Sequence, residues 1–336
     1  MIDKQLLEKV DSHGMYKVYD KWPEIARKYY EADFTEINFG EINHVVFAGM
    51  GGSGTIGDIF ASILSKTNIH VDVVKGYLLP KTVSSKSLIV VTSVSGNTEE
   101  TLNVLSSAYK MKCKLIAFSD GGKIQEYCNK KGVNYRNISM VHSPRASFPA
   151  FLFSILKNLE SFLPIEKIDI INSLNELEKQ RMSISSNNLS ENNPAINLAK
   201  AISDIPMIYY PWGLQAAAIR FKNSLQENTK IHAISEDVIE ACHNGIVSWS
   251  KFSDIKPIFI RGKDDYIKTD ERWEILKDYF EKEGIDYREV FSLSGNILTK
   301  LINLIYLFDY ASIYKAISME VDPTPVKAID FIKDRL

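Results

Sequence analysis

The sequence predicts an α/β protein with two parallel β-sheets, each flanked by helices in a three-layer α/β/α arrangement. Short runs rich in β-branched residues alternate with longer stretches of helical spacing, the pattern of βαβ units around a parallel sheet. A strand, a glycine turn and a helix follow one another near residue 45 and again near residue 206. We therefore expect the fold to be duplicated within the chain.

The first half contains the clearer strand signals. Apolar runs predict buried strands, and the stretches between them have the period of amphipathic helices. The expected strands are 45–48, 71–74, 87–92, 114–118 and 135–138, and the expected helices are 55–64, 98–109 and one that begins at 121–122.

The middle of the chain has helical character and leads into a second α/β half. Residues 151–192 are rich in Leu, Lys, Glu, Asn and Ser, with 183–193 as the loosest part. We expect domains at 1–150 and 193–336, joined by the helical connector 151–192. The second half is expected to hold strands 206–210, 256–260 and 287–291 and helices 213–226, 271–283 and 298–316.

Length and composition restrict the class of protein. A chain of 336 residues suits two ordinary domains, and 45% hydrophobic with 24% charged residues is typical of globular proteins. The net charge of −2 gives no electrostatic reason to expect nucleic acid or a membrane as partner. Three cysteines without CxxC spacing, a charged N-terminus and the lack of a long apolar run indicate a soluble cytoplasmic protein.

The most informative segment is Ser-Val-Ser-Gly-Asn-Thr-Glu-Glu at 93–100, between a predicted strand and a predicted helix. N–H groups at a helix start attract anions, and the hydroxyls of Ser93, Ser95 and Thr98 add donors. An ordinary helix start would explain Thr98 to Glu100, but not the two serines ahead of Gly96. We interpret the segment as a phosphate loop. Where the second half would repeat it, residues 260–266 are charged instead.

Residues 49–54, Gly-Met-Gly-Gly-Ser-Gly, match the dinucleotide-binding fingerprint G-x-G-x-x-G. That fingerprint also requires an acidic residue at the end of the next strand. Asp72 lies within the expected strand, and Lys75 is nearer its end. We therefore disfavour a dinucleotide and expect the glycines to let a small ligand lie against the backbone.

Together these motifs resemble the sugar isomerase (SIS) fold. The matching residues are Gly51-Gly52-Ser53 after the first strand and the hydroxyl loop after the third. Within this fold, the chain resembles the bifunctional phosphoglucose/phosphomannose isomerase family over nearly its whole length. The segments that carry this resemblance, in order, are 49–54, 143–146, 227–228, 243–244 and 321–333.

The resemblance implies an aldose–ketose isomerase that acts through an enediolate. It implies that Ser93, Ser95 and Thr98 hold the phosphate of the substrate, and that Gly51, Gly52 and Ser53 contact its sugar end. It assigns Glu227 as the base, with partial burial expected to raise its pKa. From the residues alone, Glu227 fits a surface glutamate at a polar helix end equally well.

The resemblance also implies roles for three further side chains. His243 would move a proton to the ring oxygen, and Arg145 would stabilise the enediolate, although a surface arginine in a Pro-containing turn is the alternative. The family's C-terminal pattern favours Lys333 over Lys327 as the catalytic lysine. A homodimer is implied, with His243 reaching the partner's active site.

No metal or other cofactor is expected, because no histidine pair has metal-ligand spacing with carboxylates. The substrate is expected to be a sugar phosphate. The resemblance implies that a hydroxyl residue near the catalytic lysine allows mannose 6-phosphate as a substrate besides glucose 6-phosphate. Thr324 is the nearest hydroxyl residue in the tail, and Val326 is the alternative occupant of that position. The alternatives are a glucosamine 6-phosphate-forming isomerase, whose N-terminal nucleophilic cysteine is missing here, and a non-catalytic sugar-phosphate sensor.

Overall fold

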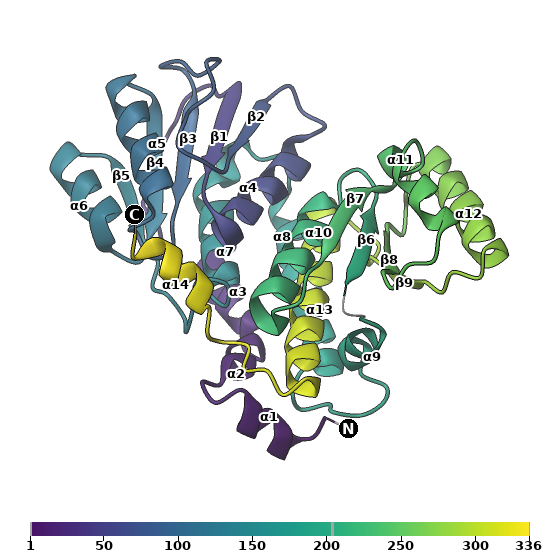
Figure 1. The fold of residues 1–336 in the computed structure, drawn as a ribbon. Coiled ribbons are helices and arrows are strands. Elements are labelled where there is room, and N and C mark those ends of the chain that lie inside the picture. Colours follow the sequence, from purple (N-terminus) through teal and green to yellow (C-terminus); the bar gives the residue numbers. More distant parts are fainter. Residues whose placement is uncertain (1, 203–204, 336) are drawn as a thin grey trace. The chain divides into compact units, whose positions relative to one another are not determined.

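The computed structural model describes residues 2–202 and 205–335, which form two compact units (Figure 1). The first-sheet unit contains Lys21–Ile170 and Lys327–Leu336, and the second-sheet unit contains Met1–Asp20 and Ile171–Val326. The expected ranges 1–150, 151–192 and 193–336 are each continuous in sequence. In the structure, the N-terminal residues up to Asp20 group with the second-sheet unit, and the C-terminal residues from Lys327 group with the first-sheet unit. The division falls within helix α8 (Lys167–Ile184).

The first-sheet unit is built around a five-stranded parallel sheet in the order β2-β1-β3-β4-β5. Every residue of β1 and β3 is buried, which explains why these strands read as continuous apolar runs. The strands are β1 (His44–Ala48), β2 (His70–Val74), β3 (Leu88–Thr92), β4 (Lys114–Ser119) and β5 (Asn134–Asn137).

Helices cover both faces of this sheet. On one face, Val46, Ile89 and Leu115 of the strands pack with α5 (Glu99–Lys110) and α6 (Gly122–Lys131). On the other, Phe47 stacks on Phe60 of α4 (Gly51–Leu64), with ring centroids 4.8 Å apart. The remaining helices of the unit are α3 (Trp22–Tyr30), α7 (Phe148–Leu159), the 3₁₀ turn Glu160–Phe162 and α14 (Lys327–Lys333).

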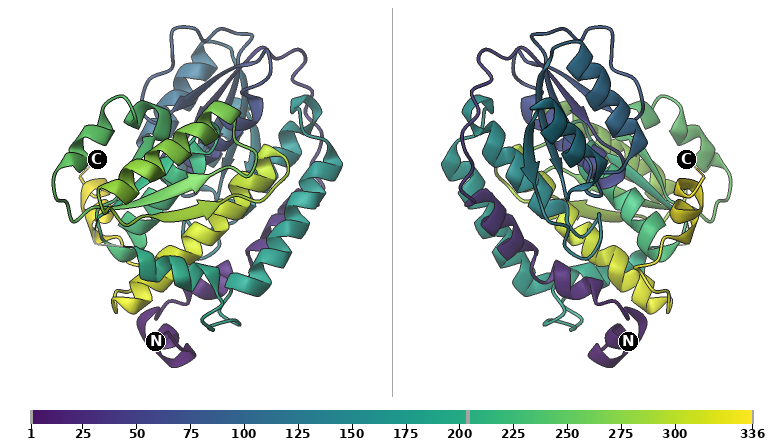
Figure 2. Two further views of the ribbon diagram at one scale, coloured as in Figure 1. Left: turned by 90° about the vertical axis from the view of Figure 1, so that its right-hand side faces the viewer. Right: turned by 90° about the vertical axis from the view of Figure 1, so that its left-hand side faces the viewer.

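The second-sheet unit contains a four-stranded parallel sheet in the order β7-β6-β8-β9. Phe259 packs on Trp273 of α12 on one face, and α10 and α13 lie on the opposite side (Figure 2). The strands are β6 (Pro206–Tyr210), β7 (Ile234–Asp237), β8 (Lys256–Arg261) and β9 (Arg288–Phe291). The helices are α1 (Lys4–Val10), α2 (Met15–Tyr19), most of α8, α9 (Pro194–Ala201), α10 (Gln215–Ser224), α11 (Val238–Ala241), α12 (Ile267–Lys282) and α13 (Ile297–Ser318), with a π-helical turn at Leu225–Thr229 and a 3₁₀ turn at Gly245–Ser250.

The predicted fold class is confirmed, and every predicted strand is present within a residue or two. Three differences have physical causes. Helix α4 begins at Gly51 rather than Thr55, so the glycine cluster forms its first turn. The predicted helix 213–226 ends at Ser224 in a π-helical turn. Strand β7 is not predicted, because Ile-Ser-Glu-Asp is a polar edge strand without a buried face.

Among the described residues, no helix is long and apolar enough to span a membrane.

A buried ion pair joins α10 to α13 inside the second-sheet unit. The Arg220 and Asp309 side chains are 3% and 0% exposed, and Arg220 Nη2 donates to Asp309 Oδ2 over 2.6 Å. Ser224 Oγ and Tyr19 OH also donate to this carboxylate, at 2.6 and 3.2 Å. Burial by itself lowers the pKa of Arg220, but the Asp309 carboxylate outweighs burial and raises it.

We predict that Asp309→Asn lowers the free energy of unfolding by about 3–5 kcal/mol, because it leaves the buried Arg220 charge uncompensated. Urea unfolding measures this loss. The exposed pair of Lys268 and Glu271 supplies the control, and Glu271→Gln should change stability by less than about 1 kcal/mol. The double variant Arg220→Met, Asp309→Leu should recover most of the loss. A cost for Asp309→Asn as small as that of Glu271→Gln would show that the pair is not an important constraint.

Candidate functional site

Two of the predicted loops lie at the switch point of the first sheet. The chain passes from β1 to β2 on one side and then returns to β3 on the other, so β1 and β3 are neighbours, with Ala48 beside Val91. Ligands of parallel α/β sheets bind outside the carboxyl ends of the strands at such a point. Residues 51–53 follow β1 and residues 93–98 follow β3, so both segments lie at this edge.

Gly51, Gly52 and Ser53 form the first turn of α4. The N-cap residue is Met50, whose side chain makes no capping hydrogen bond, and this turn contains no acidic residue. The positive end of the helix dipole is therefore not neutralised by local side chains, which favours an anionic or polar ligand. Glycine is required for the turn itself, since a Cβ atom on Gly54 would lie 2.8 Å from the Gly49 carbonyl oxygen.

The hydroxyl loop is held in one conformation by its own polar groups. Ser93 is buried, and its Oγ lies 2.8 Å from Thr98 Oγ1. Ser95 Oγ accepts a hydrogen bond from the Asn97 N–H at 3.3 Å, and Asn97 Oδ1 accepts one from the Lys123 N–H at 3.1 Å. Thr98 is the N-cap of α5, but its side chain does not cap the helix. The loop therefore presents hydroxyls that are not used for capping α5.

Gly96 allows a close approach between two backbone segments of the first-sheet unit. Its φ is +67°, and a Cβ atom at this position would lie only 1.9 Å from the Gly121 carbonyl oxygen, so other residues are excluded. The Gly96 carbonyl accepts a hydrogen bond from the Ile124 N–H at 2.9 Å. Gly96 therefore lets the hydroxyl loop pack closely against the loop that follows β4.

Arg145 is buried in the segment between β5 and α7, with 5% of its surface exposed. This burial rules out the surface-arginine alternative. The segment follows the carboxyl end of β5, the same end of the parallel sheet at which the hydroxyl loop follows β3. Ser147 Oγ accepts from the Val141 N–H at 2.8 Å and closes the turn around it.

Glu227 belongs to the second-sheet unit and lies in the π-helical turn after α10. Such turns are often found at functional sites. Asn228 Nδ2 donates to Ser312 Oγ at 2.8 Å, and Thr229 Oγ1 donates to the Leu225 carbonyl at 2.5 Å. Glu227 is partly buried, and its negative charge is one of those that raise the pKa of Arg220.

The turn that carries Glu227 is thus supported by α13, through residues that the sequence analysis did not single out. Arg220, Asp309 and Ser312 link α10 and α13 beneath it. One signal could have identified them: Asp309 is the single charged residue within the largely apolar run 301–314.

His243 is exposed in the turn after α11. It is separated from Glu227 along the chain by β7 and α11. The four residues of β7 alone span about 13 Å.

The predicted catalytic lysines lie in the C-terminal tail. Lys327 and Lys333 begin and end α14, and this tail groups with the first-sheet unit, which also carries the hydroxyl loop. Both side chains are exposed, and no residue of α14 is buried. The apolar residues Ile329, Phe331 and Ile332 are 38%, 57% and 60% exposed. The choice of Lys333 over Lys327 stays a prediction.

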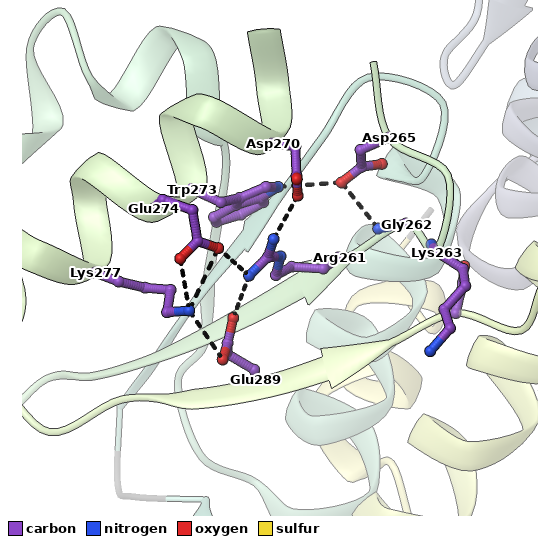
Figure 3. Close-up of polar contacts among 10 residues, drawn as sticks. Arg261, Gly262, Lys263, Asp265, Asp270, Trp273, Glu274, Lys277 and Glu289 are labelled. Carbon is purple, nitrogen blue, oxygen red and sulfur yellow. Dashed lines mark hydrogen bonds and ion pairs between the residues drawn. The ribbon is translucent and has the colours of Figure 1, made fainter. Parts of the chain in front are cut away.

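In the second sheet, the segment after β8 corresponds in position to the hydroxyl loop, and carboxylates of the chain itself bind there (Figure 3). Arg261, at the carboxyl end of β8, is buried and binds Asp270, Glu274 and Glu289. Asp265 Oδ2 accepts hydrogen bonds from the Gly262 N–H at 3.0 Å and from Trp273 Nε1 at 3.1 Å. The Asp265 carboxylate thus accepts the hydrogen bond from the Gly262 N–H that an external anion would need.

The acidic residue that a dinucleotide site needs is engaged elsewhere. Asp72 lies in the middle of β2 and contacts His44 and His70, while Lys75 beyond the strand end pairs with Asp58 at 2.5 Å. The contact between Asp72 and two histidines corrects one expectation. A histidine pair does have metal-ligand spacing with a carboxylate, because the pairing of β1 with β2 brings these side chains together.

Comparisons with known proteins agree with this architecture. Residues 191–336 match the family described as bacterial phospho-glucose isomerase C-terminal SIS domain. The bifunctional phosphoglucose/phosphomannose isomerase of Caldicellulosiruptor bescii is 31% identical over 96% of this chain and 98% of its own length. The protein of the same name from Aquifex aeolicus is 28% identical over 96% of each chain.

A solved structure supports the fold. Glucosamine-6-phosphate deaminase from Thermotoga maritima superposes with a TM-score of 0.66 at 14% identity, over 96% of this chain and 97% of that one. Because the sequence likeness to the Caldicellulosiruptor protein spans nearly the full length of both chains, the chain belongs to the bifunctional phosphoglucose/phosphomannose isomerase family and is an isomerase.

Proposed function

We propose that the chain interconverts glucose 6-phosphate and fructose 6-phosphate, and also accepts mannose 6-phosphate, through a cis-enediolate intermediate. Family membership supports the reaction class. The observation that carries the proposal is the pairing of two anion-attracting elements at one switch point. The hydroxyls of Ser93 and Thr98 follow β3, and the uncapped first turn of α4 follows β1 beside it.

The phosphate of the substrate binds the hydroxyl loop. Ser93, Ser95 and Thr98 donate hydrogen bonds to the phosphate oxygens, and hydrogen bonds to a charged acceptor are the stronger kind. The loop is well suited to this role because its contact with Gly121 holds the backbone before the substrate arrives. Gly51, Gly52 and Ser53 offer backbone N–H groups to the sugar hydroxyls.

Proton transfer is assigned to Glu227. Its carboxylate takes the proton from C2 of the aldose and returns it to C1, which gives the ketose. Partial burial supports this role, and so does the π-helical turn that α13 braces through Ser312. Negative charge that develops on the enediolate oxygens is stabilised by the Arg145 guanidinium and by the Lys333 ammonium, or by Lys327 in its place.

Ring opening is assigned to His243, which donates a proton to the ring oxygen and is supplied by a second copy of the chain. Two observations support a homodimer of this kind. Glu227 precedes β7 whereas His243 follows β7 and α11, and large apolar side chains are exposed in the segments after β6, β7 and β8. These are Trp212, Val247, Phe252 and Tyr266, which are 74%, 68%, 93% and 72% exposed.

The proposed mechanism assigns protonation of the ring oxygen and the transfer of the C2 proton to side chains, and it involves no metal or organic cofactor. The cytoplasm is the proposed location, and Cys113, Cys128 and Cys242, which form no disulfides, are compatible with its reducing conditions. There the reaction would connect hexose phosphates at the level of glycolysis and gluconeogenesis.

We predict that Glu227→Gln lowers kcat for fructose 6-phosphate by about 10²- to 10⁴-fold and changes KM little, because the amide keeps the shape of the side chain but cannot accept the C2 proton. A coupled assay that follows glucose 6-phosphate measures this loss. Gln226→Ala, in the same turn, is the matched control and should keep full turnover.

The same assay with mannose 6-phosphate tests the second activity, which should fall in parallel. An inactive wild-type protein would favour the sugar-phosphate sensor over the enzyme. A Glu227→Gln variant as fast as the wild type would remove Glu227 from the role of base.

We predict that His243→Ala lowers kcat about 10²-fold by slowing ring opening. Mixing this variant with Glu227→Gln, followed by subunit exchange, then distinguishes the source of the histidine. If His243 comes from the partner, each hybrid dimer has one intact site, and random exchange restores about a quarter of wild-type activity in a symmetric dimer. If both residues of a site come from one chain, hybrids stay inactive. Light scattering verifies that dimers form.

A further inference from the structure

His44, His70 and Asp72 converge on one face of the first sheet, at the edge opposite the hydroxyl loop. His44 opens β1 and His70 opens β2, and the parallel register makes them direct partners. Side chains two residues apart on a strand share a face, so Asp72 joins His70 on that face. The imidazole rings of His44 and His70 are 4.8 Å apart.

The polar atoms of the three side chains point at a common place. His44 Nε2 lies 2.9 Å and His70 Nε2 lies 3.3 Å from the same oxygen, Asp72 Oδ2. One ligand atom from each of the three residues lies within 4.8 Å of the others. Zn²⁺ binds His nitrogen and carboxylate oxygen at about 2.0–2.2 Å, and tetrahedral ligands at that radius are about 3.3 Å apart. The two distances from the histidine nitrogens to Asp72 Oδ2 are close to this value.

The surroundings of His44 resemble those of a metal ligand in two respects. The residue is buried at 7% exposure, which restricts its ring, and its Nδ1 lies 3.0 Å from Ser87 Oγ. A hydrogen bond at the second ring nitrogen orients a ligating imidazole and sets its tautomer. His70 is more exposed, so solvent can reach the group and supply a further ligand.

We propose that His44, His70 and Asp72 bind one divalent transition-metal ion, of which Zn²⁺ is the best match. Two imidazoles and one carboxylate suit Zn²⁺, whereas Mg²⁺ and Ca²⁺ require oxygen ligands. The site lies one full strand length, about 13–16 Å, from the end of β1 that carries the substrate loops. Its role is structural, because the ion would tie the edge strand β2 to β1.

Zinc binding to the metal-stripped full-length protein tests this proposal, with equilibrium dialysis for stoichiometry and thermal unfolding for stabilisation. We expect wild type to bind one more Zn²⁺ per chain than His70→Ala or Asp72→Asn, since loss of a ligand should weaken affinity by at least about 100-fold. Zn²⁺ should raise the Tm of wild type but not of these variants, because binding to the folded state alone stabilises it. Co²⁺ should give the visible absorption of a tetrahedral site.

His13→Ala is the matched control, since His13 also pairs with one aspartate, Asp322 at 3.4 Å, but the pair belongs to no three-ligand group among the described residues. This variant should retain the Zn²⁺ that His70→Ala loses. Isomerase turnover should be similar with and without Zn²⁺ in all of these proteins. Equal stoichiometry in wild type and His70→Ala, or an equal rise in Tm with Mg²⁺, would overturn the proposal.

Discussion

The return of the chain from β2 across β1 to β3 is the constraint on which the candidate site depends. All five strands of the first sheet are parallel, so each strand ends at the same edge and each following helix begins there. Because β1 and β3 are neighbours, the first turns of α4 and α5 leave adjacent strands. The first turn of α4, which contains no acidic residue, is thereby brought beside the hydroxyls that precede α5, where an anion lowers the electrostatic energy.

The first four strands of the first sheet and the four strands of the second sheet have the same order, but different groups lie at the carboxyl ends of their strands. At β3, serine and threonine hydroxyls bond to one another and leave donors for a ligand. At β8, Asp265 accepts the Gly262 N–H, and three carboxylates neutralise Arg261. Burial raises the pKa of Asp265, but hydrogen bonds from Gly262 and Trp273 oppose this rise and stabilise the carboxylate. The second sheet therefore provides its own anion at this edge.

Much of the fold could be predicted from the sequence, since buried parallel strands read as apolar runs and glycine turns separate them from helices. The polar strand β7 and the N-terminal helices could not, because their burial depends on distant partners such as the contact of Tyr19 with Asp309. Local chemistry predicted Ser93, Ser95 and Thr98 as the hydroxyls of a phosphate loop, whereas a resemblance was needed for Glu227 and Lys333. The approach of His44 to His70 depends on strand register, which no sequence motif reveals.

The central claim is that the hydroxyl loop anchors the phosphate of the substrate. Inhibition of fructose 6-phosphate turnover by inorganic phosphate tests it most directly, in wild type, in Ser93→Ala and in the exposed control Ser85→Ala. Loss of a hydrogen bond to a charged group costs about 1.5–3 kcal/mol, so phosphate should inhibit competitively, with an inhibition constant raised about 10- to 100-fold in Ser93→Ala alone. An unchanged constant in that variant would contradict the account.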